Sequence, residues 1–173
     1  MRDRFTGGIH PLREIEVMNV NDTTTAPDFE LSNQFGEPIR LSSFRGVRPV
    51  ALVFFPLAFT GICTSELCEL RDNLGMFQSR GMELLAVSVD SKATLREFAE
   101  REGYEFSLLA DFWPHGAVAR DFGVFDTVHG TAERATFVID AEGVIRSRIL
   151  TPRGRARTLD AYQEALAALD PAE

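Results

Sequence analysis

The sequence predicts an α/β protein with a central mixed β-sheet flanked by helices. Two continuous apolar runs, residues 50–55 and 84–89, are typical of strands that are covered on both faces of a parallel sheet. Each run is followed by a segment whose apolar residues have helical spacing, and a β-hairpin pattern comes near the C-terminal end. With 173 residues, the chain is long enough to bury the core of one such domain.

The predicted strands follow from β-favouring apolar runs and from the turns between them. They are residues 29–31, 39–41, 50–55, 84–89, 106–109, 136–139 and 144–150. Pro56 ends the third of these strands, because proline has no N–H to donate to a ladder. A turn over residues 140–143 joins the last two strands as a hairpin.

The predicted helices follow from apolar residues at helical spacing and from capping residues. They are residues 64–79, 92–102, 115–121 and 158–169. Ser91 caps the second helix and Gly103 stops it. The apolar stripe of the first helix consists of Leu67, Leu70, Leu74 and Phe77. Parallel β-α units followed by a hairpin and a last helix predict a sandwich of thioredoxin type.

Residues 1–20 are expected to be a flexible extension, and residues 21–173 to form the domain. The first segment mixes glycine and proline with charged residues and shows no hydrophobic periodicity. Met18 is therefore an alternative functional start to Met1.

Charge and hydropathy exclude several classes of partner. The chain has 18 basic and 26 acidic residues and a formal net charge of −8, which argues against binding to nucleic acid or to an anionic membrane. No apolar stretch approaches the ~20 residues that span a bilayer, and residues 1–18 lack the apolar core of a secretory signal. A cytoplasmic location is expected.

The two cysteines, Cys63 and Cys68, cannot form a disulfide framework, and a close pair in a reducing compartment is more often catalytic or metal-binding. Cys63 lies at the start of a predicted helix, where free backbone N–H groups and the helix dipole favour a thiolate. Taken alone, it could instead be a small buried hydrophobe.

The string Pro56-x-x-x-Thr60-x-x-Cys63, between an apolar strand and a helix, resembles the active-site signature of the peroxiredoxins. Residues 54–63 and 111–118 look most like the AhpE-like branch, and residues 134–140 look like the family's arginine-bearing strand. The resemblance extends over roughly residues 24–169. It implies a thioredoxin-like fold and a thiol-dependent peroxidase with the catalytic residues Pro56, Thr60, Cys63 and Arg134.

Physical chemistry gives each of these residues a role. Arg134 can stabilise the Cys63 thiolate and polarise the peroxide, and the Thr60 hydroxyl can donate to one peroxide oxygen and accept from the other. Pro56, which has no N–H, can shield the thiolate. Singly, Thr60 could only shape a turn, Pro56 only end a strand and Arg134 only form a surface ion pair.

Two further residues are candidates for supporting roles. The resemblance implies that Glu66 orients Arg134 through a carboxylate–guanidinium pair, although an acidic residue in a first helical turn also favours the helix by itself. Trp113 either lines the pocket or packs the loop beneath it, and packing in the core is the preferred interpretation.

Cys68 departs from a single-cysteine scheme. The C-x4-C spacing is that of the PrxQ branch, whose second cysteine resolves the sulfenic acid. At about 100° per residue, Cys68 points about 140° away from the apolar stripe, so we expect it to face outward. This position favours a resolving role over that of a passive thiol.

The remaining candidates are weaker. The three histidines, with two cysteines at this spacing, match no usual zinc pattern, and no metal, haem or flavin is expected. They are His10, His115 and His129. The arginines of a basic run could attract an anionic partner or reductant, but a solvated loop is the preferred interpretation. They are Arg146, Arg148, Arg153, Arg155 and Arg157.

The predicted function is reduction of hydrogen peroxide or an organic hydroperoxide by Cys63, which becomes a sulfenic acid. Cys68 or an external thiol, either a thioredoxin-like protein or a low-molecular-weight thiol, would regenerate the enzyme. The resemblance implies a homodimer with Phe59 and Trp113 near the interface. The alternatives are a thioredoxin-like disulfide reductase, whose usual C-x-x-C is lacking, and a redox-dependent binding module or holdase.

Overall fold

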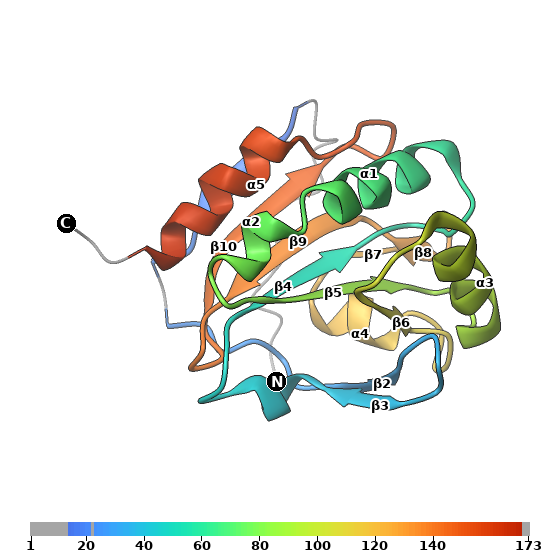
Figure 1. Ribbon diagram of the computed structural model, residues 1–173, viewed down its shortest axis with the longest axis horizontal. Coiled ribbons are helices and arrows are strands. Elements are labelled where there is room, and N and C mark those ends of the chain that lie inside the picture. Colours follow the sequence, from blue (N-terminus) through green and yellow to red (C-terminus); the bar gives the residue numbers. More distant parts are fainter. Residues whose placement is uncertain (1–13, 22, 171–173) are drawn as a thin grey trace.

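The computed structural model describes residues 14–21 and 23–170, and a six-stranded mixed sheet lies at its centre (Figure 1). The strands of the sheet are β1 (Glu16–Asn19), β4 (Val50–Phe54), β5 (Glu83–Ser88), β6 (Ser107–Ala110), β9 (Arg134–Ile139) and β10 (Ile145–Thr151). Their order is β1-β10-β9-β4-β5-β6. β4, β5 and β6 are parallel, whereas the ladders that join β4, β9, β10 and β1 are antiparallel. The predicted fold class is confirmed.

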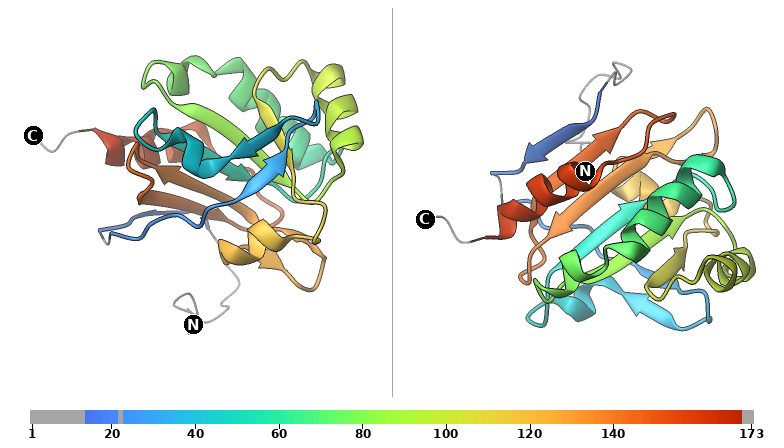
Figure 2. Two further views of the ribbon diagram at one scale, coloured as in Figure 1. Left: turned by 90° about the horizontal axis from the view of Figure 1, so that it is seen from below. Right: turned by 45° about the horizontal axis from the view of Figure 1, so that its top comes forward.

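Helices and two small hairpins cover this sheet. The helices are α1 (Gly61–Asp72), α2 (Gly75–Gln78), α3 (Lys92–Glu102), α4 (Ala117–Asp121) and α5 (Leu159–Leu166), with short 3-10 helices η1 (Leu41–Phe44) and η2 (Ala167–Leu169). The hairpins are β2 (Glu30–Ser32) with β3 (Pro38–Arg40) and β7 (Phe125–Asp126) with β8 (Thr131–Ala132). α1, α2 and α5 lie on one face of the sheet, and α4 lies on the other (Figures 1 and 2).

Strand β4 is buried on both of its faces. Ala51 and Val53 belong to the core cluster beneath α1, α3 and α5, whereas Leu52 and Phe54 belong to the cluster beneath α4. This alternation is the two-residue period of a strand. A continuous apolar run therefore fits β4, because neither face of the strand meets water.

The same alternation places Arg134 at the start of β9. Val138 and Arg134 are an even number of residues apart, so their side chains lie on the same face of β9, toward α1 and α5. The side chain of Ala135 points into the opposite cluster. Ala135 pairs with Phe54, so Arg134 lies beside the end of β4. The chain leaves β4 there and runs to Cys63.

The predicted helix over residues 64–79 is in fact two helices. α1 ends at Asp72, and its C-cap Asn73 has φ −120° and ψ 26°, outside the helical region. The backbone and side-chain N–H groups of Asn73 both donate to the Glu69 carbonyl, at 3.1 and 2.9 Å. The side-chain bond is added to the ordinary backbone bond of the last turn, and the non-helical backbone of Asn73 divides the apolar stripe between two helices.

The boundary predicted at residue 20 is also different in the structure. Residues 16–19 are strand β1, which pairs antiparallel with β10 and covers an edge that would otherwise be open. A strand of four residues is too short to show periodicity. The first 13 residues of the predicted extension lie outside the described residues.

Candidate active site

The loop after β4 places Cys63 in the first turn of α1. Pro56 is buried directly after the strand, and Thr60 is the N-cap of the helix, with φ −93° and ψ 148°. Cys63 is the third helical residue, and its side chain has 0% exposure. The predicted position of Cys63 at a helix N-terminus is confirmed, and the free N–H groups and dipole of that end favour negative charge.

Contacts from β5 and α3 fix the loop that precedes Cys63. The Ala58 N–H donates to Asp90 Oδ2 at 2.8 Å, and the Ser88 hydroxyl donates to the same oxygen at 2.6 Å. Phe59 has a φ of +62°, which is unusual for a residue other than glycine, and its ring contacts that of Phe98 with 4.9 Å between centroids. The start of α1 is therefore held by packing and by a carboxylate.

Arg134 reaches Cys63 from β9. Its Nη1 lies 3.2 Å from Cys63 Sγ and 3.1 Å from Glu66 Oε2. Its Nε donates to the Arg153 carbonyl at 2.7 Å, and the side chain is almost completely buried. The structure thus brings together three residues that the sequence analysis singled out, Cys63, Glu66 and Arg134.

Glu66 is buried between two guanidinium groups. Besides Arg134, the Arg157 side chain contacts Glu66 Oε2, with its Nη2 at 2.8 Å. Burial alone would raise the pKa of Glu66, but the charge and hydrogen bonds of Arg157, together with the charge of Arg134, outweigh it. The pKa of Glu66 lies below its ordinary value, so the carboxylate is ionised at neutral pH.

Arg157 is the residue of this site that the sequence analysis missed. It was expected in a solvated loop, but it is 1% exposed. Its Nη1 donates to the carbonyls of Phe54 and Ala135, each at 2.8 Å, and its backbone N–H donates to Glu66 at 2.6 Å. The only sequence signal was its position just before the N-cap Thr158, where the chain turns back over the sheet.

Thr60 is exposed, and its hydroxyl donates to the Leu57 carbonyl at 2.9 Å instead of capping α1. Because a hydroxyl has one hydrogen, this bond leaves the oxygen as an acceptor. Thr60 lies at the loop–helix junction, as the motif predicts. Its hydroxyl hydrogen, however, is bonded within the loop to the Leu57 carbonyl.

Cys68 does not face solvent as expected. It is half-buried, with its Sγ 3.5 Å from the Tyr104 hydroxyl oxygen and 3.6 Å from Glu102 Oε2. Cys68 would face solvent only if the sheet alone covered α1. The segment at the end of α3 covers a second flank of the helix, and Cys68 lies under it.

Trp113 does not pack in the core, which corrects the expectation. Its side chain is 82% exposed, and that of its neighbour Phe112 is 54% exposed. Asp111 anchors this segment instead, because its buried carboxylate accepts from the N–H groups of Val118 and Ala119 in α4 at 3.1 and 2.9 Å. Burial raises the pKa of Asp111, and the two hydrogen bonds offset part of this increase.

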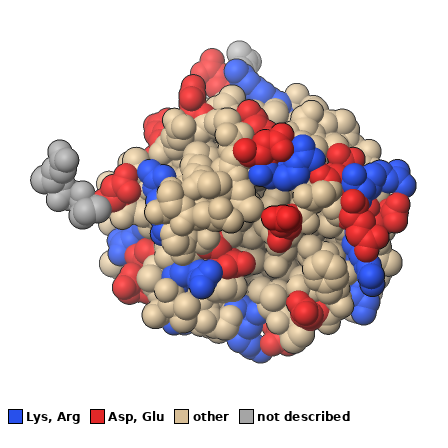
Figure 3. Space-filling view, in the orientation of Figure 1, with Lys and Arg blue, Asp and Glu red and all other residues tan. Residues whose placement is uncertain are grey.

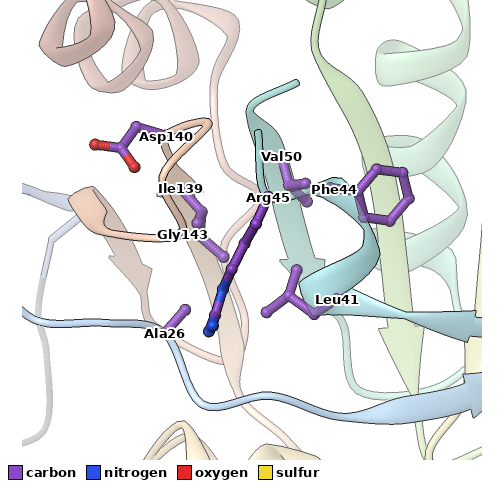
Figure 4. Close-up of a pocket in the computed structure, with 8 residues that line it drawn as sticks. All are labelled: Ala26, Leu41, Phe44, Arg45, Val50, Ile139, Asp140 and Gly143. Carbon is purple, nitrogen blue, oxygen red and sulfur yellow. The ribbon is translucent and has the colours of Figure 1, made fainter. Parts of the chain in front are cut away.

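Two pockets of the described structure lie away from Cys63, and one of them is an open pocket between β1 and α5. Figure 4 shows a small pocket at the opposite end of β4 and β9, where Arg45 runs between Val50 and Gly143. Acidic and basic side chains are interspersed on the face shown in Figure 3. Within residues 14–21 and 23–170, no cluster of His, Cys, Asp and Glu could hold a metal ion, and no helix could span a membrane.

Comparison with known proteins agrees with this geometry. A model described as the AhpC/TSA family matches residues 23–148. The chain is 46% identical over 150 residues to alkyl hydroperoxide reductase E of Mycobacterium tuberculosis (strain H37Rv), covering 87% of this chain and 98% of the relative. It is 35% identical to chloroplastic peroxiredoxin Q of Sedum lineare, covering 79% and 73%.

A solved structure shares the fold over most of its length. The crystal structure of peroxidoxin BcpB from Mycobacterium tuberculosis matches with a TM-score of 0.73 and 34% identity, covering 88% of this chain and 96% of that one. The chain therefore belongs to the AhpC/TSA family and has a thioredoxin-like fold. Within that family it is a peroxiredoxin, a thiol-dependent peroxidase.

Proposed function

We propose that this enzyme reduces hydrogen peroxide and organic hydroperoxides through the Cys63 thiolate. The observation that carries the proposal is the 3.2 Å contact between Arg134 Nη1 and Cys63 Sγ. Two guanidinium groups and one carboxylate, those of Arg134, Arg157 and Glu66, leave a net charge of +1 beside the sulfur. A buried positive charge favours the thiolate over the thiol.

The reaction transfers one oxygen atom to sulfur. The thiolate attacks one peroxide oxygen, the S–O bond forms as the O–O bond breaks, and the other oxygen leaves as hydroxide or alkoxide that takes up a proton. Arg134 donates to the oxygens as charge develops on them. The Thr60 oxygen accepts the hydrogen of the peroxide, since its own hydrogen is given to Leu57.

Enclosure of the sulfur strengthens these interactions. Cys63 is fully buried, and Pro56 adds a wall without an N–H group. Substrate access then requires a small movement of the exposed loop residues Phe59 and Thr60. Trp113, exposed in the structure, is assigned no contact with the reacting atoms.

The sulfenic acid is then resolved by Cys68 or by an external thiol. When Cys68 attacks, an S–S bond replaces the S–O bond and water leaves, so no further oxidant is needed. On an intact helix, residues five apart have Cα atoms roughly 8–9 Å apart. A disulfide tolerates less than about 7 Å, so the first turns of α1 must unwind before the bond forms.

Assembly and location complete the proposal. A thioredoxin-like protein or a low-molecular-weight thiol returns both cysteines to the thiol state, which suits the reducing cytoplasm. A second copy of the chain covers the exposed aromatic side chains of Phe59 and Trp113, which are 44% and 82% exposed. The enzyme is thus proposed to be a cytoplasmic homodimer.

Mass spectrometry after one equivalent of peroxide tests this scheme. A loss of about 2 Da shows the Cys63–Cys68 disulfide, a gain of about 16 Da shows a stable sulfenic acid, and a mixed disulfide shows an external reductant. The Cys68→Ser variant is the control, and it should give only the second and third products. Oxidation that leaves Cys63 unmodified would contradict the proposal.

A further inference from the structure

The polar partners of Cys68 are not explained by the peroxide reaction itself. Cys68 lies beneath the end of α3 and contacts Glu102, the last residue of that helix, and Tyr104, which follows it. The Glu102 carboxylate and the Tyr104 hydroxyl oxygen can both accept the single thiol hydrogen of Cys68. The Tyr104 oxygen lies 3.5 Å from the sulfur and accepts in this contact, because the hydrogen of the hydroxyl goes to the Thr64 carbonyl.

The Tyr104 hydroxyl has a second partner in α1. It donates to the Thr64 carbonyl at 3.3 Å. In a regular α-helix this carbonyl accepts the N–H group four residues later, which is that of Cys68. Tyr104 therefore contacts both residues that this helical hydrogen bond joins, the carbonyl of Thr64 and the side chain of Cys68, and the bond must break when Cys68 leaves α1.

Tyr104 is itself held in a fixed position. Its ring is 6% exposed, stacks on Phe106 with 5.3 Å between centroids and meets Phe98 edge to face at 5.1 Å. Burial and the contact with Cys68 raise the pKa of Tyr104 far above its ordinary value. The hydroxyl therefore stays protonated and remains a donor throughout the physiological pH range.

We propose that Tyr104 is a positioning residue that holds residues 64–68 in the helix and thereby sets the rate at which Cys68 reaches the oxidised Cys63. This inference rests on the proposed resolving role of Cys68. While the contact lasts, the sulfenic acid persists, because Cys68 stays under the α3 segment. Release of Tyr104 frees the Thr64 carbonyl and the Cys68 sulfur together, so that the disulfide can form with loss of water.

The Tyr104→Phe variant tests this proposal, because it keeps the ring packing and removes only the hydroxyl. We expect amide exchange of residues 64–68 in the reduced enzyme to rise about five-fold, the factor that one ordinary hydrogen bond supplies. Formation of the disulfide after one equivalent of peroxide should accelerate by a similar factor. The rate of the first oxidation of Cys63 should not change.

The matched control is Ser147→Ala. Ser147 is a buried hydroxyl on β10 that donates to the Ala165 carbonyl of α5 at 3.1 Å, so its loss also removes one bond to a helix carbonyl. We expect Ser147→Ala to lower the free energy of unfolding about as much as Tyr104→Phe does, but without faster amide exchange at residues 64–68. A variant that merely loosens the fold would behave like this control.

Each outcome decides one part of the proposal. Unchanged exchange at residues 64–68 in Tyr104→Phe, or faster exchange with disulfide formation at the wild-type rate, would overturn the role of Tyr104. Faster exchange without a disulfide in any variant, wild type included, would support the contact but overturn the resolving role of Cys68.

Discussion

Three buried charged side chains define the electrostatics around Cys63. Glu66 holds Arg134 and Arg157 in place, since its two oxygens accept from both guanidinium groups. Removing a partner from such a cluster leaves a buried charge without compensation, which is more costly than the loss of a surface ion pair. The cluster therefore links the stability of the fold to the charge at the reacting sulfur.

Arg134→Ala tests the electrostatic role of this arginine. Loss of its charge removes a donor to the sulfur and to the peroxide, so the rate of peroxide reduction should fall by at least about 10²-fold. Arg134→Lys should restore only part of the rate, because lysine lacks the planar fork that contacts Cys63 and Glu66 together. Stopped-flow measurement of Cys63 oxidation would check both, and an alanine variant with wild-type kinetics would contradict the assignment.

Glu66→Gln tests the cluster as a structural unit. Two buried guanidinium groups would lose their counter-charge, and the free energy of unfolding at pH 7 should fall by about 3 kcal/mol. Because the folded-state pKa of Glu66 is below its ordinary value of 4.5, its contribution is complete above that pH and is lost as the pH falls through the folded-state value.

Denaturant unfolding of wild type and Glu66→Gln from pH 7 to pH 3 would check this prediction. The difference in unfolding free energy between the two proteins should be constant down to about pH 5 and should narrow below it. A difference that widens as the pH falls would contradict a lowered pKa of Glu66 in the folded state.

The sequence predicted the local part of the site better than its distant part. Pro56, Thr60 and Cys63 lie within eight residues, so their spacing alone relates them, and Arg134 could be added through the family resemblance. Arg157 belongs to the same cluster but lies 91 residues from Glu66 along the chain. Its burial depends on how α5 returns over the sheet, and no local pattern shows that.

At the scale of elements, helix α1 has two tasks that oppose each other. Its N-terminus must be ordered to hold Cys63 beside Arg134, yet its first turns must unwind for a Cys63–Cys68 disulfide. The apolar stripe predicted the buried face of α1 correctly at Leu67 and Leu70. It could not predict the cover that the α3 segment provides over Cys68, because that contact is set by tertiary packing.

Cys68→Ser separates these two tasks. The variant keeps the contacts of Cys63, so the first turnover should be unchanged, but the sulfenic acid should accumulate and overoxidise at excess peroxide. Mass spectrometry of Cys63 after repeated peroxide additions would show a gain of about 32 Da or more. If wild type and variant recycle equally well with the same external thiol, the enzyme works in single-cysteine mode.

For the whole molecule, periodicity and turn residues were enough to predict the sheet and most of its cover. The continuous apolar run of β4 and the turn of the β9–β10 hairpin are local signals, and both elements form as expected. Strand β1 and the exposure of Trp113 were not predicted. Both depend on what the remainder of the molecule leaves open at an edge or on the surface.

The proposed homodimer can be tested by sedimentation. The wild-type enzyme should have about twice the 19.3 kDa mass of one chain, and Trp113→Ser should weaken the association by removing a large exposed apolar side chain. Val47→Ser is the control, because Val47 is also exposed, at 65%, but lies just before β4, at the opposite end of that strand from Phe59. Equal masses for all three proteins would contradict the proposed interface.

The most direct test of the central claim is peroxide turnover by Cys63→Ser. A hydroxyl is far less ionised than a thiol at neutral pH and cannot form a sulfenic acid, so catalysis should be abolished while circular dichroism shows an intact fold. The assay uses catalytic amounts of enzyme with an excess of peroxide and dithiothreitol. Loss of turnover in Cys63→Ser is the predicted result, and appreciable turnover by a folded Cys63→Ser enzyme would contradict the assignment of Cys63 as the nucleophile.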